Sequence, residues 1–269
     1  MSSTKSVASV IFAAGKGSRM LGFDGNKTLL PLKPGPSIFE GKRPLLEEVL
    51  HNLPPGPRGI VVNHRAEDVR KATEATGARY LHQPSTNGTG GALLAARSFL
   101  ESTTEDFVVI TMGDVPLIRS QTYAQLIDGL DRWELMVLAF EPRDRAQYGM
   151  LETDGDRLLR IVEWKYWSEY PPERQAGLRF CNAGVYAARR TALLECMEKL
   201  AAHPHHVRKQ RGGEWVVIEE YFLTDIVEFL GSGAAGVAMA PEEDVIGVDT
   251  PEALKRVQEI HARRIASGN

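Results

Sequence analysis

Cysteine is scarce, since the 269-residue chain contains only Cys181 and Cys196. Two cysteines exclude the disulfide framework of a small secreted domain, and no CxxC or Cys/His spacing indicates zinc, so we expect reduced thiols, with Cys181 in the core. No apolar run approaches the roughly 18 residues that a membrane-spanning helix needs. The first apolar stretch is followed too soon by Lys16 and Arg19 to be a signal peptide. We therefore expect a cytoplasmic protein without a membrane partner.

A large charge of one sign is also absent, because 32 Lys and Arg residues stand against 35 Asp and Glu residues, a formal net charge of −3. Proteins that bind nucleic acids usually carry a basic excess, so we expect no nucleic-acid partner. Hydrophobic residues make up 43% of the chain and charged residues 25%, which is typical of a globular protein. The length suffices for one large α/β domain or two small ones.

Apolar, β-branched runs alternate with helical patterns in the first half of the chain. The predicted strands lie at residues 6–14, 59–64, 107–112 and 135–140, and the predicted helices at 91–102 and 120–130. Runs that are apolar on both faces favour a mostly parallel sheet covered by helices on both sides. This alternation predicts an α/β fold.

Beyond about residue 140 the pattern changes. Residues 148–164 form two extended pieces around Asp154-Gly155-Asp156, which indicates a hairpin and therefore antiparallel strands. Residues 166–179 and the histidine-rich, basic residues 203–215 are interpreted as exposed loops. The aromatic residues of 164–170 fit either a sugar-stacking surface or a small hydrophobic cluster under a loop. An amphipathic helix is predicted from Pro251 to the C-terminus.

A glycine-rich stretch, AAGKGSRM at residues 13–20, follows the first predicted strand directly. Glycines between a strand and a helix let backbone N–H groups approach a phosphate, although a tight turn alone explains Gly15 and Gly17 equally well. A dinucleotide-binding GxGxxG would need glycine in place of Met20, and a Walker A loop would need GKS or GKT. Neither motif is present, which argues against a nicotinamide-dependent oxidoreductase.

Two cations, Arg19 and Lys27, follow the glycines, and such a pair can bind a leaving pyrophosphate and neutralise the reacting phosphate. The loop AAGKGSRM, followed by this lysine and LLPL, resembles the signature of sugar-phosphate nucleotidyltransferases (NDP-sugar pyrophosphorylases). Within that family the chain is most similar to the uridylyltransferase domain of N-acetylglucosamine-1-phosphate uridylyltransferases. The family usually has proline before the lysine, where this chain has Asn26.

The resemblance implies a nucleotide site in the first half of the chain. QPSTNGTGG, at residues 83–91, looks like the family's base-recognition loop, in which a glutamine precedes Gly-Thr-Gly. Without the resemblance, a surface amide and a helix-entry turn explain these residues. The implied nucleotide-binding residues are Ala13, Ala14, Gly15, Gly17, Gln83, Gly88 and Thr89, with Arg19, Lys27 and Asp114 catalytic.

An acidic residue also ends a buried strand, in VVITMGDVPLI at residues 108–118, where Asp114 is suitably placed to hold a cation above the sheet. The resemblance makes Asp114 a ligand of Mg²⁺ and nominates Asp249, in DVIGVDTPEAL, as the second ligand. Uridylyltransferases of the family carry asparagine there, and other members carry aspartate. A helix cap ahead of Pro251 is the alternative explanation for Asp249.

The sugar side is implied by motifs in the second half of the chain. YGMLETDGDRLLRIVEWK, FCNAGVY and EEYFLTDIV resemble family segments that contact the sugar phosphate. Phe222 stands where the uridylyltransferases commonly have tyrosine. The implied sugar-binding residues are Gly149, Glu163, Lys165, Asn182 and Thr224.

The resemblance implies a single domain, residues 1–269, with a Rossmann-like (GT-A-like) nucleotidyltransferase fold and a mixed, mostly parallel central sheet flanked by helices. Residues 5–130 would bind the nucleoside triphosphate, 131–250 the sugar 1-phosphate, and 250–269 would form the C-terminal helix. No counterpart of the hexapeptide-repeat acetyltransferase domain is found, so we expect neither acetyl transfer nor its trimer, but a monomer or homodimer.

The expected reaction is nucleotidyl transfer from UTP to N-acetylglucosamine 1-phosphate or a similar sugar 1-phosphate, with Mg²⁺ as cofactor. Two alternatives stay open. The first is a cytidylyl-, guanylyl- or thymidylyltransferase acting on another sugar phosphate or on phosphocholine. The second is a sensor that binds nucleotide sugars without catalysis, although such a protein would be expected to lack one of the cations or carboxylates that are present here.

Overall fold

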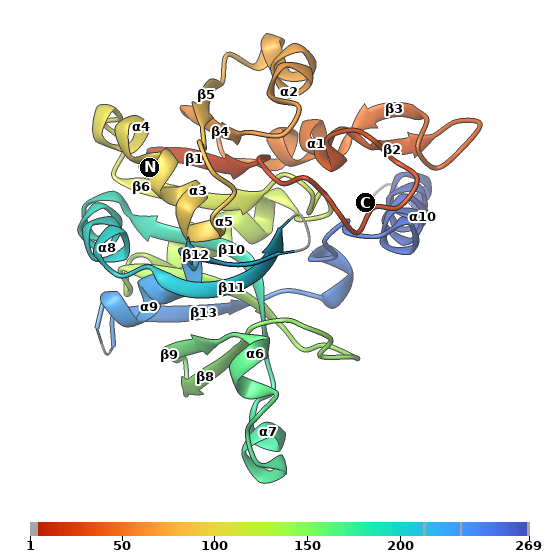
Figure 1. The fold of residues 1–269 in the computed structure, drawn as a ribbon. Helices are drawn as coiled ribbons and strands as arrows, with labels where there is room; N and C mark the ends of the chain where they lie inside the picture. The colour runs from red at the N-terminus through yellow and green to blue at the C-terminus, as the bar shows by residue number, and fades with distance from the viewer. Residues whose placement is uncertain (1–4, 212–213, 232, 268–269) are drawn as a thin grey trace.

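The computed structural model describes residues 5–211, 214–231 and 233–267, and its centre is one large sheet. The strands are β1 (Val7–Phe12), β4 (Arg58–Val62), β5 (Arg79–His82), β6 (Phe107–Met112), β7 (Leu135–Phe140), β8 (Met150–Asp154), β9 (Arg157–Val162), β10 (Cys181–Arg189) and β13 (Ala235–Met239). Their order is β5-β4-β1-β6-β10-β7-β13-β9-β8 (Figure 1). β5, β4, β1 and β6 pair in parallel, as do β7 and β13, whereas β10 is antiparallel to both β6 and β7. The expected mixed sheet is confirmed.

Helices cover both faces of this sheet. The helices of the described residues are α1 (Leu45–Asn52), α2 (Ala66–Thr73), α3 (Thr89–Ala95), α4 (Arg97–Ser102), α5 (Ser120–Gly129), α6 (Trp164–Trp167), α7 (Pro172–Gly177), α8 (Arg190–Ala202), α9 (Ile226–Phe229) and α10 (Pro251–Ser267), with 3-10 turns η1 (Lys27–Leu29), η2 (Glu74–Thr76), η3 (Leu223–Asp225) and η4 (Glu242–Asp244). Of these, α1 to α6, α8 and α9 supply residues to the two large buried clusters of the sheet. One buried cluster joins the sheet to α1, α2 and α5, and a second joins it to α3, α4, α8 and α9. The prediction of a doubly covered sheet is therefore confirmed.

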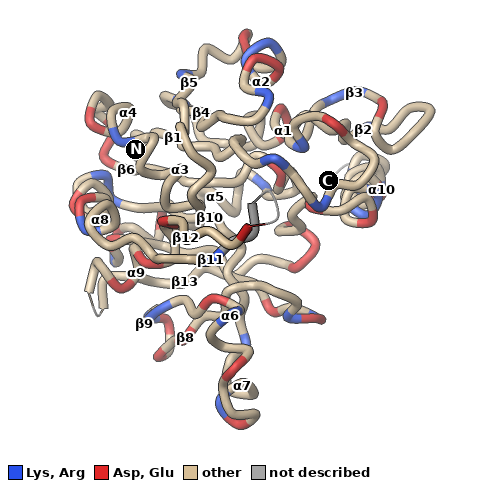
Figure 2. The backbone as a smooth tube through the Cα atoms, in the orientation of Figure 1, with Lys and Arg blue, Asp and Glu red and all other residues tan. Residues whose placement is uncertain are grey.

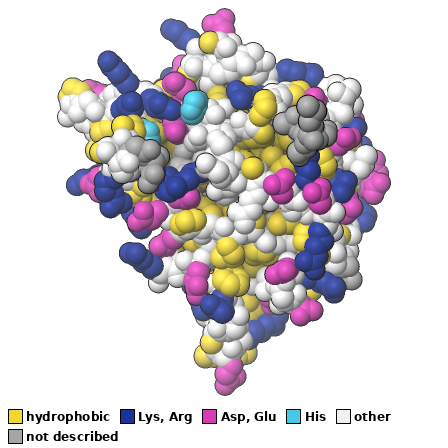
Figure 3. Space-filling view, turned by 180° about the vertical axis from the view of Figure 1, so that it is seen from behind, with side chains coloured by type: hydrophobic (Ala, Val, Ile, Leu, Met, Phe, Trp, Pro, Cys, Tyr) yellow, Lys and Arg dark blue, Asp and Glu magenta, His cyan; other side chains and the backbone are white. Residues whose placement is uncertain are grey.

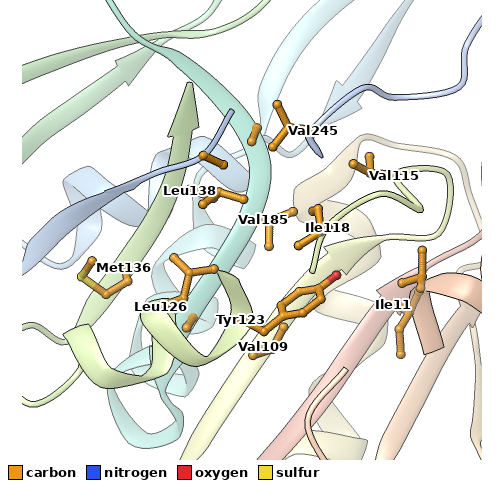
Figure 4. Close-up of a cluster of buried hydrophobic side chains, with 14 of the residues drawn as sticks. Ile11, Val109, Val115, Ile118, Tyr123, Leu126, Met136, Leu138, Val185 and Val245 are labelled. Carbon is orange, nitrogen blue, oxygen red and sulfur yellow. The ribbon is translucent and has the colours of Figure 1, made fainter. Parts of the chain in front are cut away.

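The strands supply both clusters because successive side chains point to opposite faces. In β1, Val10 belongs to one cluster and Ile11 to the other, and both are fully buried. Figure 4 shows the cluster of Ile11, in which Tyr123 of α5 lies among aliphatic side chains of the sheet. The Tyr123 hydroxyl lies 3.1 Å from Thr111 Oγ1, so its polar atom has a partner. Each fully buried aliphatic side chain contributes about 2 kcal/mol.

A third, smaller cluster holds α10 against the segment that follows β1. Leu254 and Val257 of α10 pack there with Met20 and Leu30, all at most 4% exposed. The position where a dinucleotide-binding loop would need its third glycine is thus a core methionine. This packing fixes the loop after β1 next to the residues that precede α10.

Two hairpins stand outside the main sheet: β2 (Pro31–Pro34) with β3 (Gly41–Pro44), and β11 (His205–Arg211) with β12 (Glu214–Glu220). The interpretation of residues 203–215 as a loop was wrong, because β11 pairs with β12 from His205↔Glu220 onward. Side chains of this hairpin, among them Trp215 and Val217, are exposed. The hairpin therefore lacks the pattern of buried apolar residues by which strands are predicted from a sequence. The loop predicted at 166–179 is also wrong, since α6 and α7 lie there and Pro172 opens α7.

Other predicted elements are confirmed with shifted ends. The helix predicted at 91–102 is two helices, α3 and α4, which meet at Ala96. β8 and β9 flank the predicted turn at Gly155, whose φ is +58°. The C-terminal helix begins at Pro251 as predicted. Cys181 and Cys196 are free and buried, as expected.

Charged residues of both signs are spread over the molecule. Figure 2 shows Lys and Arg interspersed with Asp and Glu along the whole chain, and the rear face in Figure 3 carries both signs as well. This distribution agrees with the near-zero net charge. Within the described ranges, no helix has both the length and the apolar character required to span a bilayer.

Candidate active site

Two carboxylates and a lysine meet at the carboxyl end of β6. Asp114 follows β6, Asp249 precedes α10, and Lys27 is the first residue of η1. The Lys27 ammonium forms ion pairs with Asp114 Oδ2 and with Asp249 Oδ1. The backbone N–H of Val248 donates to the carbonyl oxygen of Asp114 over 2.9 Å, which ties the two acidic segments together. Three predicted site residues that are distant in sequence are therefore in direct contact.

Burial and the neighbouring charges shift the pKa of Lys27 in opposite directions. Its side chain is 15% exposed and that of Asp114 is 14% exposed, whereas Asp249 is 36% exposed. Burial disfavours the ammonium, but the charges of Asp114 and Asp249 outweigh it and raise the pKa of Lys27 above its ordinary value of 10.5. Arg19 Nη2 lies 2.7 Å from Asp249 Oδ2 on the solvent side. Lys27 is thus a cation at neutral pH, held between two carboxylates.

This donor set suits a hard divalent cation. Mg²⁺ is commonly held by one or two carboxylates together with substrate phosphates and water. Asp114 and Asp249 supply two carboxylates that converge on one positive charge, the Lys27 ammonium. In the part of the chain that the structure describes, no group of three or more His, Cys, Asp or Glu residues could hold a metal. Asp114 and Asp249 are thus the two carboxylates that would hold such a cation here, and phosphate and water oxygens are ligands that Mg²⁺ commonly adds.

The glycine-rich loop leaves β1 beside this cluster. A Cβ atom on Gly15 would have no atom within 4 Å, so the backbone there faces open space. Gly17 has a φ of +60°, and a Cβ atom on it would lie 3.3 Å from the Lys27 side chain. Ala13 extends the pairing of β1 with β4, since its N–H donates to the carbonyl oxygen of Val61 at 2.9 Å. The loop thus offers open backbone at one glycine and lets Lys27 pass at the other.

A pocket of about 330 Å³ adjoins the cation. Predicted residues from three separate segments line it: Ala14, Gly15, Lys27, Gln83, Gly88, Thr89 and Asp114. Apolar side chains, among them Phe12 and Met112, form much of the remaining wall. A small apolar pocket with a few converging polar groups is typical of a ligand site. Ala13, Gly17, Arg19 and Asp249 do not line this pocket.

Gln83 is held by the loop that follows it. The side chain is 3% exposed, and its Nε2 donates to Asn87 Oδ1 at 3.0 Å and to the Gly88 carbonyl at 3.2 Å. Gly88 has a φ of +95°, and a Cβ atom there would lie 2.3 Å from the Tyr221 carbonyl oxygen. Thr89 Oγ1 accepts a hydrogen bond from the N–H of Leu223. The loop therefore needs glycine and is fastened to the segment after β12.

That same segment carries the predicted sugar side. Thr224 Oγ1 donates to Glu163 Oε1 at 2.8 Å. Burial raises the pKa of Glu163 even though the hydrogen bond from Thr224 lowers it. A Cβ atom on Gly149 would lie 3.8 Å from Glu163 Oε2. The structure thus brings together three of the five predicted sugar-binding residues, Gly149, Glu163 and Thr224, at one partly buried carboxylate.

The other two residues of the predicted sugar side are engaged differently. The Lys165 ammonium lies 4.4 Å from the centre of the Phe222 ring. Asn182 donates through Nδ2 to the Tyr186 hydroxyl at 2.7 Å and accepts from the N–H of Gly184 at 2.9 Å. Gly184 has a φ of +74°, at the point where the register of β10 shifts against β7. The Asn182 side chain therefore stabilises this irregularity, and its sugar contact stays a prediction.

The aromatic residues of α6 divide between the two interpretations. Trp167 is 6% exposed and donates through Nε1 to the Tyr148 carbonyl at 2.8 Å, as expected of a residue packed under a loop. Trp164 and Tyr166 are 41% and 46% exposed and are open to a ligand. His205, expected at a solvated surface, instead bonds Asp225 Oδ2 at 2.8 Å and stacks against Phe222.

The sequence profile of the MobA-like NTP transferase domain matches residues 9–237. The chain belongs to this family. The resemblance to nucleotidyltransferases is thereby confirmed, and the protein is a nucleotidyltransferase. It is 32% identical over 270 residues to the bifunctional protein GlmU of Ruegeria sp. (strain TM1040) and 34% identical over 263 residues to that of Ruegeria pomeroyi. These matches cover 96% of this chain but 54% and 53% of the relatives, so the chain spans about half their length.

Solved structures agree on the fold. The uridine diphosphate N-acetylglucosamine pyrophosphorylase from Trypanosoma brucei superposes with a TM-score of 0.71 at 15% identity, covering 93% of this chain and 64% of that one. A CMP:2-keto-3-deoxy-manno-octonic acid synthetase complexed with CTP superposes with a TM-score of 0.64 at 17% identity, covering 97% and 100%. The expected Rossmann-like nucleotidyltransferase fold is therefore confirmed.

Sequence reasoning missed one residue of the site. Asn26, noted only as a departure from the family's proline, is 1% exposed and bonded to the loop after β1. An asparagine directly before a helical turn is a common N-cap, and this position carried that signal.

Proposed function

We propose that this NTP transferase moves a uridylyl group from UTP to N-acetylglucosamine 1-phosphate or a closely similar sugar 1-phosphate and releases pyrophosphate. The observation that carries the proposal is the contact of Lys27 with Asp114 and Asp249 at the mouth of a pocket that Gln83 lines. The names of the relatives and of the pyrophosphorylase with the same fold support the choice of substrates.

In this reaction an oxygen of the sugar phosphate attacks the α-phosphorus, a new P–O bond forms, and the bond to the leaving pyrophosphate breaks. The attacking phosphate is already ionised at neutral pH, because its second pKa is about 6. No general base is therefore needed. The obstacle is the repulsion between two polyanions. Catalysis then consists of positioning and charge stabilisation.

The cations of the site would perform that stabilisation. Lys27 would leave its carboxylates to contact the reacting phosphate, and the exposed Arg19 would bind the leaving pyrophosphate. Asp114 and Asp249 would hold Mg²⁺, which when bound supplies Lewis-acid polarisation of the phosphoryl oxygens. The open backbone at Gly15 would receive the phosphates.

The acceptor would lie on the side of Glu163. The partly buried Glu163 carboxylate near the backbone of Gly149 could accept hydrogen bonds from sugar hydroxyls, while Thr224 orients it. Lys165, on the face of Phe222, is a cation within the same region for the sugar's phosphate. This assignment would divide the single domain into a nucleotide half at residues 5–130 and a sugar half at residues 131–250.

The test is pyrophosphate release with Mg²⁺ from UTP, CTP, GTP and dTTP, each paired with N-acetylglucosamine 1-phosphate, glucose 1-phosphate and phosphocholine. Release that favours UTP with N-acetylglucosamine 1-phosphate supports the proposal. Release with another pair rejects the substrates and keeps nucleotidyl transfer. No release with any pair would favour the nucleotide-sugar sensor.

Asp114→Ala is the matching variant. We expect a loss of at least about 100-fold in kcat with the fold retained by circular dichroism, because a charge-stabilising group is removed. Asp156→Ala is the control, since Asp156 is 78% exposed in the turn between β8 and β9. A folded, fully active Asp114→Ala protein would contradict the metal assignment.

A further inference from the structure

Asn26 connects three parts of the site through one side chain. It is 1% exposed and caps η1, where its Oδ1 accepts from the N–H and the hydroxyl of Thr28 at 3.0 and 2.8 Å. Its Nδ2 donates to the carbonyl oxygens of Ala13 and His64 at 2.8 and 2.9 Å. Both donors and both acceptor positions of the amide are thus used inside the protein.

The two carbonyl groups identify what the amide fastens. Ala13 follows β1 and opens the glycine-rich loop, and His64 follows β4, the parallel neighbour of β1. Lys27 is the next residue after Asn26, and its side chain passes Gly17 on the way to the carboxylates. One amide therefore sets the start of the lysine side chain relative to two strand ends and to the loop.

A cap alone does not explain this arrangement. Capping η1 requires only the Oδ1 acceptor, which an aspartate supplies equally well. The two donated bonds reach residues 13 and 38 positions away, and such bonds do not stabilise the local turn. They would instead hold the turn against the sheet, with the ammonium aimed at the space between Asp114 and Asp249.

We propose that Asn26 is a positioning residue that sets the Lys27 ammonium and the glycine-rich loop in register for the triphosphate. The inference rests on the proposed function for its kinetic consequence, but the placement of Lys27 can be measured without turnover. A misplacement of about 1 Å can cost about 100-fold in rate, so Asn26→Ala is expected to lower kcat by about 10- to 100-fold. The KM for the sugar phosphate should change little.

Two further variants separate positioning from stability. Asn26→Asp keeps the cap acceptor and loses both donors, and it should lose kcat as Asn26→Ala does. Gln258→Ala is the matched control, because Gln258 is a buried amide of α10 that donates to the carbonyls of Pro31 and Ile38 at 2.7 and 2.9 Å. It removes an equal number of donated bonds and should lower the melting temperature without changing kcat.

A double-mutant cycle with Lys27→Ala supplies the decisive kinetic readout. If Asn26 acts through Lys27, then Asn26→Ala costs less than about twofold once Lys27 is gone, because coupled residues are not additive. Full additivity, or a kcat like that of Gln258→Ala, would overturn the proposal.

Acetic anhydride labelling followed by mass spectrometry tests the placement itself, with exposed Lys33 as internal reference. Lys27 should be acetylated about fivefold faster in Asn26→Ala than in the wild type, which is the factor expected for the loss of about one hydrogen bond. The acetylation rate of Lys27 in Gln258→Ala should equal that of the wild type. Unchanged labelling in Asn26→Ala refutes the proposal. A wild type without pyrophosphate release refutes the proposed function, and faster labelling would then still support the placement by Asn26.

Discussion

Replacing Lys27 by methionine removes the ammonium and keeps most of the side-chain volume. Asp114, 14% exposed, would then face Asp249 without the cation between them. Breaking a buried ion pair by removing one partner costs about 3–5 kcal/mol. Asp249 is more exposed than Asp114 and keeps its ion pair with Arg19. We therefore expect a loss at the lower end of this range, a decrease of about 3 kcal/mol in the free energy of unfolding.

That loss corresponds to a fall of roughly 6–12 °C in melting temperature for a chain of this size. The pKa of Lys27 is raised in the folded protein, so its contribution is complete below pH 10.5 and is lost as the pH rises through the folded pKa. Thermal and urea unfolding at pH 7.5 and again above pH 10.5 measure both effects. Lys33→Met, at an exposed lysine of β2, is the control for loss of a surface charge.

The same variant tests the proposed Mg²⁺ site. With the ammonium gone, Mg²⁺ should raise the melting temperature of Lys27→Met more than that of the wild type, because binding to the folded state stabilises it. Catalysis should fall by at least about 100-fold. A Lys27→Met protein with the same melting temperature as the wild type at pH 7.5 would refute the interpretation of Lys27 as the counter-ion of Asp114 and Asp249.

Two other substitutions follow from the site. Gly88→Ala should raise the KM for the triphosphate at least about tenfold, because Gly88 has a φ of +95° and the new Cβ atom would clash with the Tyr221 carbonyl oxygen. Gly177→Ala is the control and should leave this KM unchanged, since no atom lies within 4 Å of the Cβ position there. Glu163→Gln should weaken acceptor binding without destabilising the protein at pH 7.5. Burial raises the pKa of Glu163, so the stability from this group is present below pH 4.5 and is lost as the pH rises through its folded pKa. Unchanged acceptor KM, or a lower melting temperature at pH 7.5, would contradict this account.

The sequence predicted those parts of the site in which residue type and local context coincide. Gly15 follows a buried strand directly, and Asp114 follows another, so the geometry of parallel strands alone brings them to one edge. The resemblance added Asp249 and Gln83, which local pattern explained equally well as a cap and a surface amide. The structure places all four around one pocket or one cation.

Two other features were missed for different reasons. Asn26 looks like a polar turn residue, because its partners at Ala13 and His64 are brought to it only by the sheet. The hairpin of β11 and β12 was missed because its exposed, charged side chains resemble a loop, and backbone pairing alone makes it a strand pair. Long-range hydrogen bonds therefore account for the first error, whereas the second concerns a local pairing of consecutive strands, from Arg211↔Glu214 to His205↔Glu220.

The segment at residues 221–224 links the two halves of the proposed reaction. Its first carbonyl accepts from the N–H of Gly90 at 2.9 Å, and the N–H of Leu223 donates to Thr89, so it fixes the loop that holds Gln83. One residue later, Thr224 holds the Glu163 carboxylate. A displacement of this short segment would move the base-side loop and the acceptor carboxylate together. If the proposed function holds, base and sugar selection would therefore be coupled through this segment, and a change of acceptor specificity built on Phe222 would be expected to alter the affinity for the triphosphate as well.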